Sequence, residues 1–398
     1  MSCSEASRPT GPVKSQELSP STALREATTS GAAGQPLAWQ DGLAKARRRR
    51  MPRGLKIAIV WLLEFAAIFA LAETISVFFL PPGLIFYHPQ QQVEPSARRI
   101  YDSQPNQRTF TIDKPYVTNS LGFRDEREVP LAKHGELRIL SLGDSIAQGL
   151  GVAAEDTYAR KLEASLAPRY GAVRVINAAV ASYSTWQEVD LLEDKGLRVR
   201  PDIVMLSFCW NDLFPRPRLV IPLPVGDSNQ YYNATLLRVL RELKRSRVLS
   251  FLRERLEIAL FKAFPSFGWT HQQMIYEGRT SPYLEQSYSD VAASLEAFAS
   301  LARIHHFVPI LIILPMPGQV RHPDPAAHMQ RRMEAIARRV GIPTVDLLPV
   351  LQQAYASTRD VYIQWDNTHL SPRGHQAVAA ALERYLLDSQ LIKRQGGA

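Results

Sequence analysis

The stretch LRILSLGDSIAQG, residues 137–149, decides the fold class of this chain. Its apolar residues between Ile139 and Leu142 are typical of a strand that is buried on both faces. Gly-Asp-Ser then turns the chain, and the amphipathic stretch AEDTYARKLEASL, residues 154–166, predicts a helix. A serine at the carboxyl end of a buried strand, beside free backbone N–H groups, is well placed for chemistry. Because Gly-Asp-Ser is common by chance, Ser145 alone fits a helix-starting residue as well as a nucleophile.

Four more apolar runs follow the first, separated by stretches with helical periodicity such as YSDVAASLEAFASLARIHH and MQRRMEAIARRV. The four runs are VRVINAAVA, DIVMLSFC, PILIILPM and IPTVDLLP. Five strands that alternate with helices predict an α/β fold with a mostly parallel sheet covered on both faces. In such a sheet the functional residues gather in the loops at the carboxyl ends of the strands.

Composition and charge favour a globular domain attached to a membrane. The chain has 398 residues and a net charge of +9, and seven basic residues fall within the twelve positions KARRRRMPRGLK, just before the longest apolar run. That placement indicates membrane topology and not nucleic-acid binding. The sequence contains no zinc-spaced cysteines and no phosphate-binding glycine-rich loop, so we expect no metal and no cofactor.

The longest apolar run, Ile57–Leu80, is long enough to cross a bilayer core. Its fourteen Ile, Val, Leu and Phe residues contribute about −4 to −8 kcal/mol to insertion, whereas a central acidic residue costs about 2.5 to 3.5 kcal/mol. Glu64 and Glu73 lie off the centre, so insertion is favoured, and we interpret them as individually tolerated charges. The preceding arginines predict a single-pass inner-membrane protein with a cytoplasmic N-terminus and a periplasmic domain.

A second interpretation of the same run is a signal peptide. From Met51 the sequence has a short basic start, an apolar core and a possible Ala70-Leu71-Ala72 cleavage site. Against cleavage, the apolar run continues past Ala72 to Leu80, and the preceding region is long for a signal peptide. Both interpretations export the domain that follows.

The chain therefore divides into four predicted parts. They are a disordered basic tail (1–53), a transmembrane helix (54–80), a juxtamembrane linker and lead-in segment (81–135), and an α/β domain (136–390) with a helical insertion at about 213–285. The insertion carries a leucine stripe at Leu249, Leu252 and Leu256 beside basic residues, and Ser246 is placed to cap its helix. It fits either a cap packed on the sheet or a lid that borders the cleft or touches anionic lipid headgroups.

Three further polar signals fall where predicted strands end: NAAVASYS, FCWND and WDNTHLSPRGH. In the last, Asp366 and His369 are three residues apart in a loop before Pro372, which suits a helix start. In a turn, this spacing can bring the carboxylate to one imidazole nitrogen while the other nitrogen faces a hydroxyl. A serine hydroxyl is a poor nucleophile unless such a base takes its proton.

These blocks resemble the SGNH hydrolase superfamily, the GDSL-type esterases and lipases. Gly-Asp-Ser at Ser145, Cys-Trp-Asn-Asp at Asn211 and Asp-x-x-His at His369 match its blocks in order over about residues 137–388. The resemblance implies a three-layer, flavodoxin-like sandwich with a five-stranded, mostly parallel sheet. It also implies a catalytic triad of Ser145, His369 and Asp366. The Ser145 and Ser182 N–H groups and the Asn211 side chain would form the oxyanion hole.

Two positions depart from the family pattern. Ser182 stands where the family has a glycine, and it keeps the N–H but lacks the freedom of glycine at positive φ. Cys209 replaces the glycine of the third block. Losing one oxyanion donor typically costs a rate factor of about a hundred or more, so these substitutions bear on activity although every triad position is filled.

The resulting expectation is an extracytoplasmic serine ester hydrolase that acts on acyl or acetyl esters of lipids or surface glycans. One alternative is an O-acyltransferase that passes the acyl group to a glycan hydroxyl by the same triad. The other is a catalytically weak glycan-binding or assembly module, which is suggested by Ser182 and Cys209 because both stand where the family has glycine. An α/β-hydrolase elbow is disfavoured because GDSIA lacks the closing glycine of G-x-S-x-G.

Overall fold

The computed structural model describes residues 51–213, 239, 242–263, 270–321, 327–366 and 368–392. The predicted basic tail, apart from its last three residues, and the first part of the predicted insertion lie outside the described residues. The chain divides into one unit that ends at Glu64 and a second unit, Phe65–Ala398, that contains the α/β domain.

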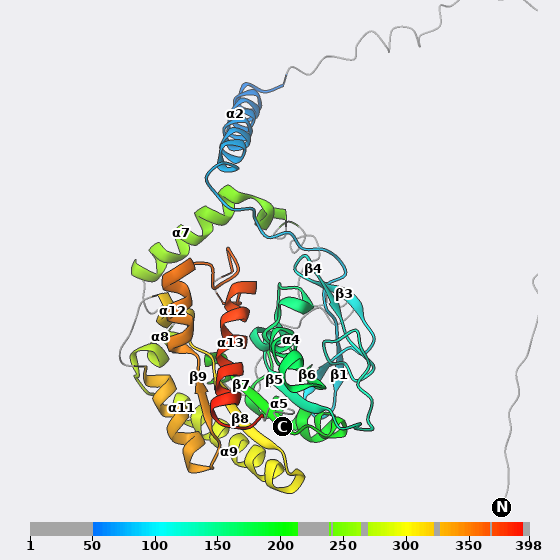
Figure 1. The fold of residues 1–398 in the computed structure, drawn as a ribbon. Helices are drawn as coiled ribbons and strands as arrows, with labels where there is room; N and C mark the ends of the chain where they lie inside the picture. The colour runs from blue at the N-terminus through cyan, green and yellow to red at the C-terminus, as the bar shows by residue number, and fades with distance from the viewer. Residues whose placement is uncertain are drawn as a thin grey trace, which may run out of the picture. The chain divides into compact units, whose positions relative to one another are not determined.

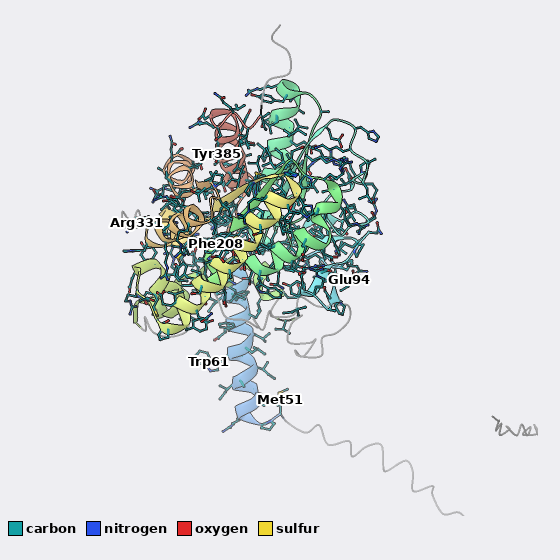
Figure 2. All side chains as sticks on the ribbon, turned by 90° about the horizontal axis from the view of Figure 1, so that it is seen from below. Met51, Trp61, Glu94, Phe208, Arg331 and Tyr385 are labelled. Carbon is teal, nitrogen blue, oxygen red and sulfur yellow. The ribbon has the colours of Figure 1, made fainter. Side chains whose placement is uncertain are left out.

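Helix α2, Arg53–Ser76, contains 24 residues and is the one described helix that is long and apolar enough to cross a membrane. At about 1.5 Å per residue it spans about 36 Å, against about 30 Å for a bilayer core. Its large apolar side chains are exposed, and Trp61 extends outward from the helix (Figure 2). A signal sequence near the N-terminus can meet the same criteria of length and apolar composition, so the helix by itself does not distinguish the two interpretations.

A five-stranded parallel sheet forms the centre of the second unit, with strand order β6-β5-β7-β8-β9. This is the flavodoxin-like order, in which the chain starts in the interior of the sheet and changes direction beside β5. The strands are β5 (Leu137–Gly143), β6 (Val173–Asn177), β7 (Ile203–Phe208), β8 (Val308–Ile313) and β9 (Thr344–Asp346). The predicted fold class is confirmed.

Helices cover both faces of this sheet, as Figure 1 shows. Successive strand residues point to opposite faces, so Leu140 and Leu142 enter one core and Ile139 enters the other. On the first face lie α5 (Thr185–Asp194), α9 (Pro282–His305) and α11 (His328–Arg339). On the second lie α4 (Tyr158–Tyr170), α12 (Leu348–Thr358) and α13 (Pro372–Asp388). Phe208, at the end of the central β7, is fully buried in the first core.

Shorter elements connect these layers. They are α3 (Ser145–Gln148), η1 (Ala154–Asp156), η2 (Gly196–Val199), η3 (Trp210–Leu213), α8 (Thr270–Glu277) and α10 (Pro317–Arg321). The helix expected at residues 154–166 is thus a 3₁₀ turn followed by α4, because Thr157 caps α4 by accepting a hydrogen bond from the backbone N–H of Arg160.

The lead-in segment is more ordered than a linker. It contains two antiparallel hairpins, β1 (Val93–Ser96) with β2 (Ile100–Ser103), and β3 (Arg108–Thr111) with β4 (Lys114–Val117). Arg99, 1% exposed, joins the first hairpin to α5. Its guanidinium donates to Asp102 at 2.8 Å and to Asp190 and Asp194 of α5 at 2.7 Å. This segment is therefore part of the folded domain.

The described part of the predicted insertion contains α7 (Arg247–Ala263) and α8. Ser246 caps α7 as expected, because its Oγ accepts a hydrogen bond of 3.0 Å from the backbone N–H of Leu249. Leu249 is half-buried, whereas Leu252 and Leu256 are 53% and 59% exposed, so this part of the stripe is not covered by the described residues. The cap and lid interpretations of the insertion both stay predictions.

Candidate active site

The sharp turn at the end of β5 places Ser145 as the first residue of α3. Gly143 has φ of +153°, and a Cβ there would collide with the Cβ of Ala147, so only glycine fits. Asp144 caps α3, because its Oδ1 accepts a hydrogen bond of 2.8 Å from the backbone N–H of Ile146. The backbone N–H of Ser145 has no acceptor within the helix, since it belongs to the first turn.

The loop before α13 is organised by a single carboxylate, that of Asp366. Its Oδ1 accepts hydrogen bonds from the backbone N–H groups of Thr368 at 2.9 Å and His369 at 3.0 Å, which closes the turn. Its Oδ2 lies 2.8 Å from Nδ1 of His369. The three-residue spacing therefore lets one side chain shape the loop and orient the imidazole, as the sequence predicts.

The imidazole of His369 also reaches the serine at the end of β5. Its Nε2 lies 2.9 Å from Oγ of Ser145, so three polar groups form a continuous hydrogen-bonded chain from carboxylate to hydroxyl. With Nδ1 donating to Asp366, Nε2 is the free base that accepts the hydroxyl proton of Ser145. This arrangement can convert a serine hydroxyl into a nucleophile.

The charges around His369 favour the protonated imidazole, the form that the reaction produces. Burial lowers the pKa of His369, but the hydrogen bond and charge of Asp366 and the charge of Asp144 outweigh burial, so the pKa of His369 lies above its usual range. Burial raises the pKa of Asp366, but the hydrogen bond and charge of His369 and two backbone N–H groups lower it to about 2. Asp366 is therefore ionised at neutral pH and stabilises an imidazolium.

Asn211 lies beside the serine turn, in η3 at the end of β7. Its Nδ2 donates a hydrogen bond of 2.8 Å to Oδ2 of Asp144, the residue before Ser145. A carboxamide nitrogen carries two hydrogens, so one remains to face a developing oxyanion. Cys209 is fully buried at the strand end, as expected, and its backbone N–H donates at 3.0 Å to Oδ2 of Asp212.

Ser182 lies in the loop after β6, and that loop is fastened to the same turn. The backbone N–H of Val180 donates a 2.9 Å hydrogen bond to the carbonyl of Gly143. Ser182 itself has φ of +63°, the left-handed region in which glycine is at ease. Ser182 therefore has the left-handed backbone conformation that a glycine would adopt readily at this position. In the described part of the chain Ser182 makes no hydrogen bond to Ser145, Asn211 or His369.

Two supports of the site come from the lead-in segment, and the sequence reasoning missed both. Tyr101 of β2 donates to the carbonyl of Ala181 at 2.8 Å, and Tyr183 donates back to the carbonyl of Tyr101 at 2.6 Å. The Ser182 loop is thus held from outside the sheet. An exchange of hydrogen bonds between residues about 80 positions apart leaves no local signal in the sequence.

The second support is Arg124, which is 3% exposed and binds the far end of the serine helix. Its guanidinium donates to the carbonyls of Gln148 at 2.7 Å, Gly149 at 2.6 Å and Val152 at 2.6 Å. Burial lowers the pKa of Arg124 to about 10, so it is still a cation at neutral pH. A cation at the C-terminal carbonyls of α3 fixes the short helix whose first residue is Ser145.

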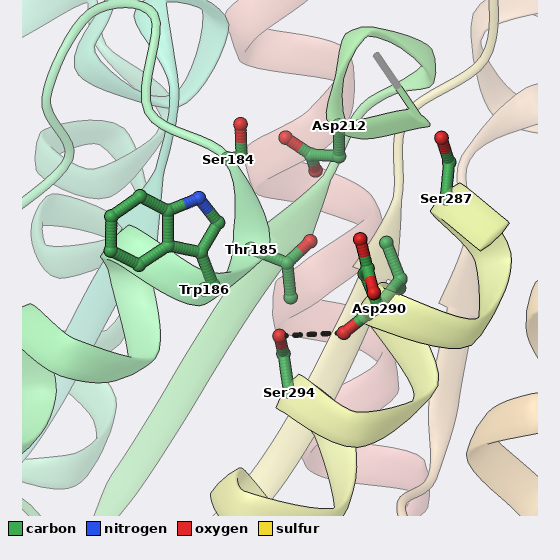
Figure 3. Close-up of a pocket in the computed structure, with 8 residues that line it drawn as sticks. Ser184, Thr185, Trp186, Asp212, Ser287, Asp290 and Ser294 are labelled. Atoms are coloured by element: carbon green, nitrogen blue, oxygen red, sulfur yellow. Dashed lines mark hydrogen bonds between the residues drawn. The ribbon is translucent and has the colours of Figure 1, made fainter. Parts of the chain in front are cut away.

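Apart from Ser145, Asp366 and His369, the described residues hold a small pocket but no cluster of metal-binding side chains. The described residues contain no group of three His, Cys, Asp or Glu side chains able to hold a metal ion. A small pocket between α5, η3 and α9 is lined by Ser184, Thr185, Asp212 and Asp290, among others, and the Ser294 hydroxyl there donates to the carbonyl of Asp290 (Figure 3). None of the Ser145, Asp366 and His369 side chains lines it.

Comparison with known sequences identifies the family. The family profile described as GDSL-like Lipase/Acylhydrolase matches residues 141–377. This chain belongs to that family. The match begins inside β5 and ends inside α13, and it leaves α2 and the lead-in segment outside. It spans the five residues predicted for the site, which are Ser145, Ser182, Asn211, Asp366 and His369. The protein is a carboxylic ester hydrolase of the GDSL type.

Several solved structures resemble this GDSL-type hydrolase. A mutant of the acetyl-xylooligosaccharide esterase Axe2 from Geobacillus Stearmophilus shares 15% identity, covering 62% of this chain and 93% of that one, with a TM-score of 0.38. The lipase/acylhydrolase from Enterococcus faecalis shares 16% identity, and the match covers 66% of this chain and 100% of that one, with a TM-score of 0.38. LAE5, an alpha/beta hydrolase enzyme from the metagenome of Lake Arreo, Spain, shares 15% identity, and the match covers 66% of this chain and 99% of that one, with a TM-score of 0.39. No curated protein matches the sequence.

Proposed function

We propose that this GDSL-type hydrolase is a membrane-anchored serine esterase with Ser145 as nucleophile and His369 as general base. Asp366 orients the imidazole of His369 and stabilises its protonated form. The observation that carries the assignment is the chain of two hydrogen bonds, 2.9 Å from Ser145 Oγ to His369 Nε2 and 2.8 Å from His369 Nδ1 to Asp366 Oδ2.

The reaction follows from these positions. Ser145 Oγ attacks the ester carbonyl carbon while His369 Nε2 takes the hydroxyl proton, and the carbonyl oxygen becomes an oxyanion. The imidazolium then gives this proton to the departing alcohol, which leaves an acyl-enzyme. A water molecule, deprotonated by the neutral His369, attacks the acyl carbon, and the second tetrahedral intermediate expels Ser145 Oγ, which takes the proton back from the imidazolium as the acid leaves. Asp366 remains ionised throughout.

We assign the oxyanion hole to three donors: the backbone N–H groups of Ser145 and Ser182 and the side-chain N–H₂ of Asn211. The first lies at the start of α3, where the N–H is unused by the helix. The positive φ of Ser182 supports the second, because it reproduces the conformation expected of a glycine at this place. The bond from Asn211 to Asp144 supports the third, because it holds the amide beside the nucleophile.

The substrate class we propose is an acyl or acetyl ester carried by a lipid or a surface glycan. Helix α2, if it crosses the membrane, keeps the enzyme beside both kinds of substrate, and the arginines that precede it favour a cytoplasmic N-terminus and an exported hydrolase domain. A C-terminal alkaline phosphatase fusion, active only outside the cytoplasm, tests this orientation against a fluorescent-protein fusion that is bright only inside.

The catalytic assignment is tested on the full chain in detergent with p-nitrophenyl acetate and longer-chain p-nitrophenyl esters. Ser145→Ala should abolish turnover, whereas Ser289→Ala, a change at an exposed serine of α9, should leave turnover intact. Equal activity of folded wild type and Ser145→Ala would overturn the assignment. Product that forms only when a glycan acceptor is added would instead establish an O-acyltransferase.

A further inference from the structure

The first relevant feature is the acidic residue near the end of α2, Glu73. Its carboxylate accepts hydrogen bonds from the backbone N–H groups of Arg247 at 2.7 Å and Val248 at 3.2 Å, and from the hydroxyl of Ser246 at 2.8 Å. It thus caps the start of α7, where the helix dipole favours a negative charge. Glu73 and α7 belong to the same folded unit.

A second set of contacts fastens the chain that leaves α2 to the start of α7. Arg247 donates a hydrogen bond to the carbonyl of Leu80. A Cβ at Gly83 would collide with the carbonyl oxygens of Lys244 and Arg245, so the two backbones touch there and only glycine fits. The beginning of α7 therefore lies beside the end of the apolar helix, at the level where a membrane-crossing segment would leave the bilayer.

Part of the apolar side of α7 is left exposed by the described residues. Leu252 and Leu256, one helical turn apart, are 53% and 59% exposed, while Ser250 of the same helix is buried at 6%. Immediately after α2, Phe78 and Phe79 are 81% and 79% exposed. Exposed large apolar side chains in this number mark an interaction surface.

Basic side chains border this surface. The helix α7 carries four basic residues and two acidic ones, a net charge of +2; they are Arg247, Arg253, Arg255 and Lys262, and Glu254 and Glu257. An amphipathic helix with leucines on one side and arginines beside them is the pattern of a helix lying in the membrane interface. Position and charge therefore point to the same occupant, a lipid surface.

The same helix is joined to the loop that holds the catalytic base. Arg253 donates a hydrogen bond of 2.9 Å to the carbonyl of Trp365, the residue before Asp366. The indole N–H of Trp365 donates in turn to the carbonyl of Pro82 at 3.1 Å, in the segment that leaves α2. Trp365 has φ of +62°, so these contacts hold it in a conformation that a tryptophan rarely adopts.

We propose that α7 lies in the membrane interface, with Leu252, Leu256, Phe78 and Phe79 inserted among the lipids. The exposed Arg255 then lies at the headgroups, while the side chains of Arg247 and Arg253 bind the carbonyls of Leu80 and Trp365. The contact from Arg253 to Trp365 then holds the loop of Asp366 and His369 at the lipid surface. The enzyme accordingly acts on esters presented at that surface, such as acyl lipids or lipid-linked glycans, in preference to dissolved esters. This proposal rests on the anchoring role proposed above for α2.

Depth-dependent fluorescence quenching tests the placement. The full chain with Cys3→Ser, which leaves the buried Cys209, receives one new cysteine at a time, labelled with NBD and reconstituted in phosphatidylcholine–phosphatidylglycerol vesicles that contain nitroxide lipids. Leu252→Cys reports on α7, Ile68→Cys on α2, and Ile304→Cys on an exposed apolar residue of α9 that serves as the control.

We expect the label at position 68 to be quenched by deep nitroxides, and the label at 252 to be quenched at least twofold more by shallow nitroxides than the label at 304. Quenching at 68 with equal, weak quenching at 252 and 304 would overturn the interfacial placement and leave the anchor intact. Absence of quenching at 68 would overturn the anchor and this proposal with it. If the label at position 252 is shielded from solvent in a crosslinked dimer without any lipid, the exposed surface of α7 binds a second copy of the chain, and the interfacial placement is overturned.

The preference for surface-bound esters has its own test. The double variant Leu252→Gln, Leu256→Gln is compared with Ile304→Gln on p-nitrophenyl acetate and on a long-chain ester embedded in the same vesicles. We expect kcat/KM for the embedded ester to fall at least tenfold in the double variant, with acetate hydrolysis and the control unchanged. No loss on the embedded ester, or an equal loss on both substrates, would overturn the proposal, whereas the Ser145→Ala result alone decides the esterase assignment.

Discussion

Replacing Asp366 by asparagine tests the proposed role of this carboxylate most directly. The amide keeps the size of the side chain but removes the charge that stabilises the imidazolium of His369. Burial raises the pKa of Asp366, but pairing with His369 and two backbone N–H groups outweighs burial and lowers the pKa from 3.8 to about 2. A net shift of about two pH units corresponds to about 2–3 kcal/mol. That loss alone predicts a fall in kcat/KM of about 30- to 150-fold.

The substitution also removes the acceptor that fixes the imidazole tautomer. An asparagine can present its N–H₂ to Nδ1, so that Nε2 carries the proton and cannot accept one from Ser145; this effect extends the expected loss toward about 10⁴-fold. Asp360→Asn is the control, since Asp360 lies on the surface with its side chain 59% exposed.

The pH dependence gives this prediction a second readout. The base works when His369 is neutral, and its pKa is above 6.5, so kcat/KM of the wild type should fall as pH drops through a value above 6.5. Without the charge of Asp366 the burial of His369 dominates, and the midpoint of the acid limb should move below 6.5. The assay is p-nitrophenyl acetate hydrolysis from pH 5 to 9. A variant within threefold of wild type, or an unmoved midpoint, would refute the role assigned to Asp366.

Three further predictions concern the supports of the site. Arg124→Met leaves buried carbonyls at the end of α3 unpaired and should lower the free energy of unfolding by about 3–5 kcal/mol in urea titrations, with kcat reduced in the protein that remains folded. Ser182→Gly should keep or raise kcat, since glycine suits φ of +63°. Ser182→Pro removes the N–H and also forces φ to about −65°, away from the observed +63°, so both effects should lower kcat, together about a hundredfold or more. Cys209 should resist maleimide in the native protein and react after unfolding, since burial raises the pKa of its thiol well above the usual value.

The sheet and the arrangement of the site were predictable because both depend on local patterns. Each core strand is an uninterrupted apolar run, and a parallel sheet brings the carboxyl ends of its strands together. Ser145 directly follows β5, whereas His369, 224 positions away, lies in the loop between α12 and α13. Their meeting was therefore predictable from the Gly-Asp-Ser and Asp-x-x-His motifs and not from strand ends alone. The Asp366 to His369 contact is local, since both side chains belong to one turn.

The lead-in segment was not predictable in the same way. Its strands have four residues each, too few for a hydrophobic period, and they are held by polar contacts with distant residues. Arg99 forms ion pairs with Asp190 and Asp194, which are more than 90 positions away in the sequence. A buried arginine is recognisable in the sequence only when its carboxylate partners are already known, so this part of the fold had to come from the structure.

Glu73 shows how a residue that seems unfavourable in a sequence acquires a physical reason in three dimensions. Within an apolar run an acidic side chain opposes insertion, and sequence reasoning could only weigh that penalty against the apolar residues around it. In the structure Glu73 lies one turn before the end of α2 and accepts three hydrogen bonds at the start of α7. Its desolvation is offset there by bonds that an alanine or leucine could not make. The same carboxylate that weakens the apolar run therefore sets where α7 begins, and α7 in turn contacts the loop that carries His369.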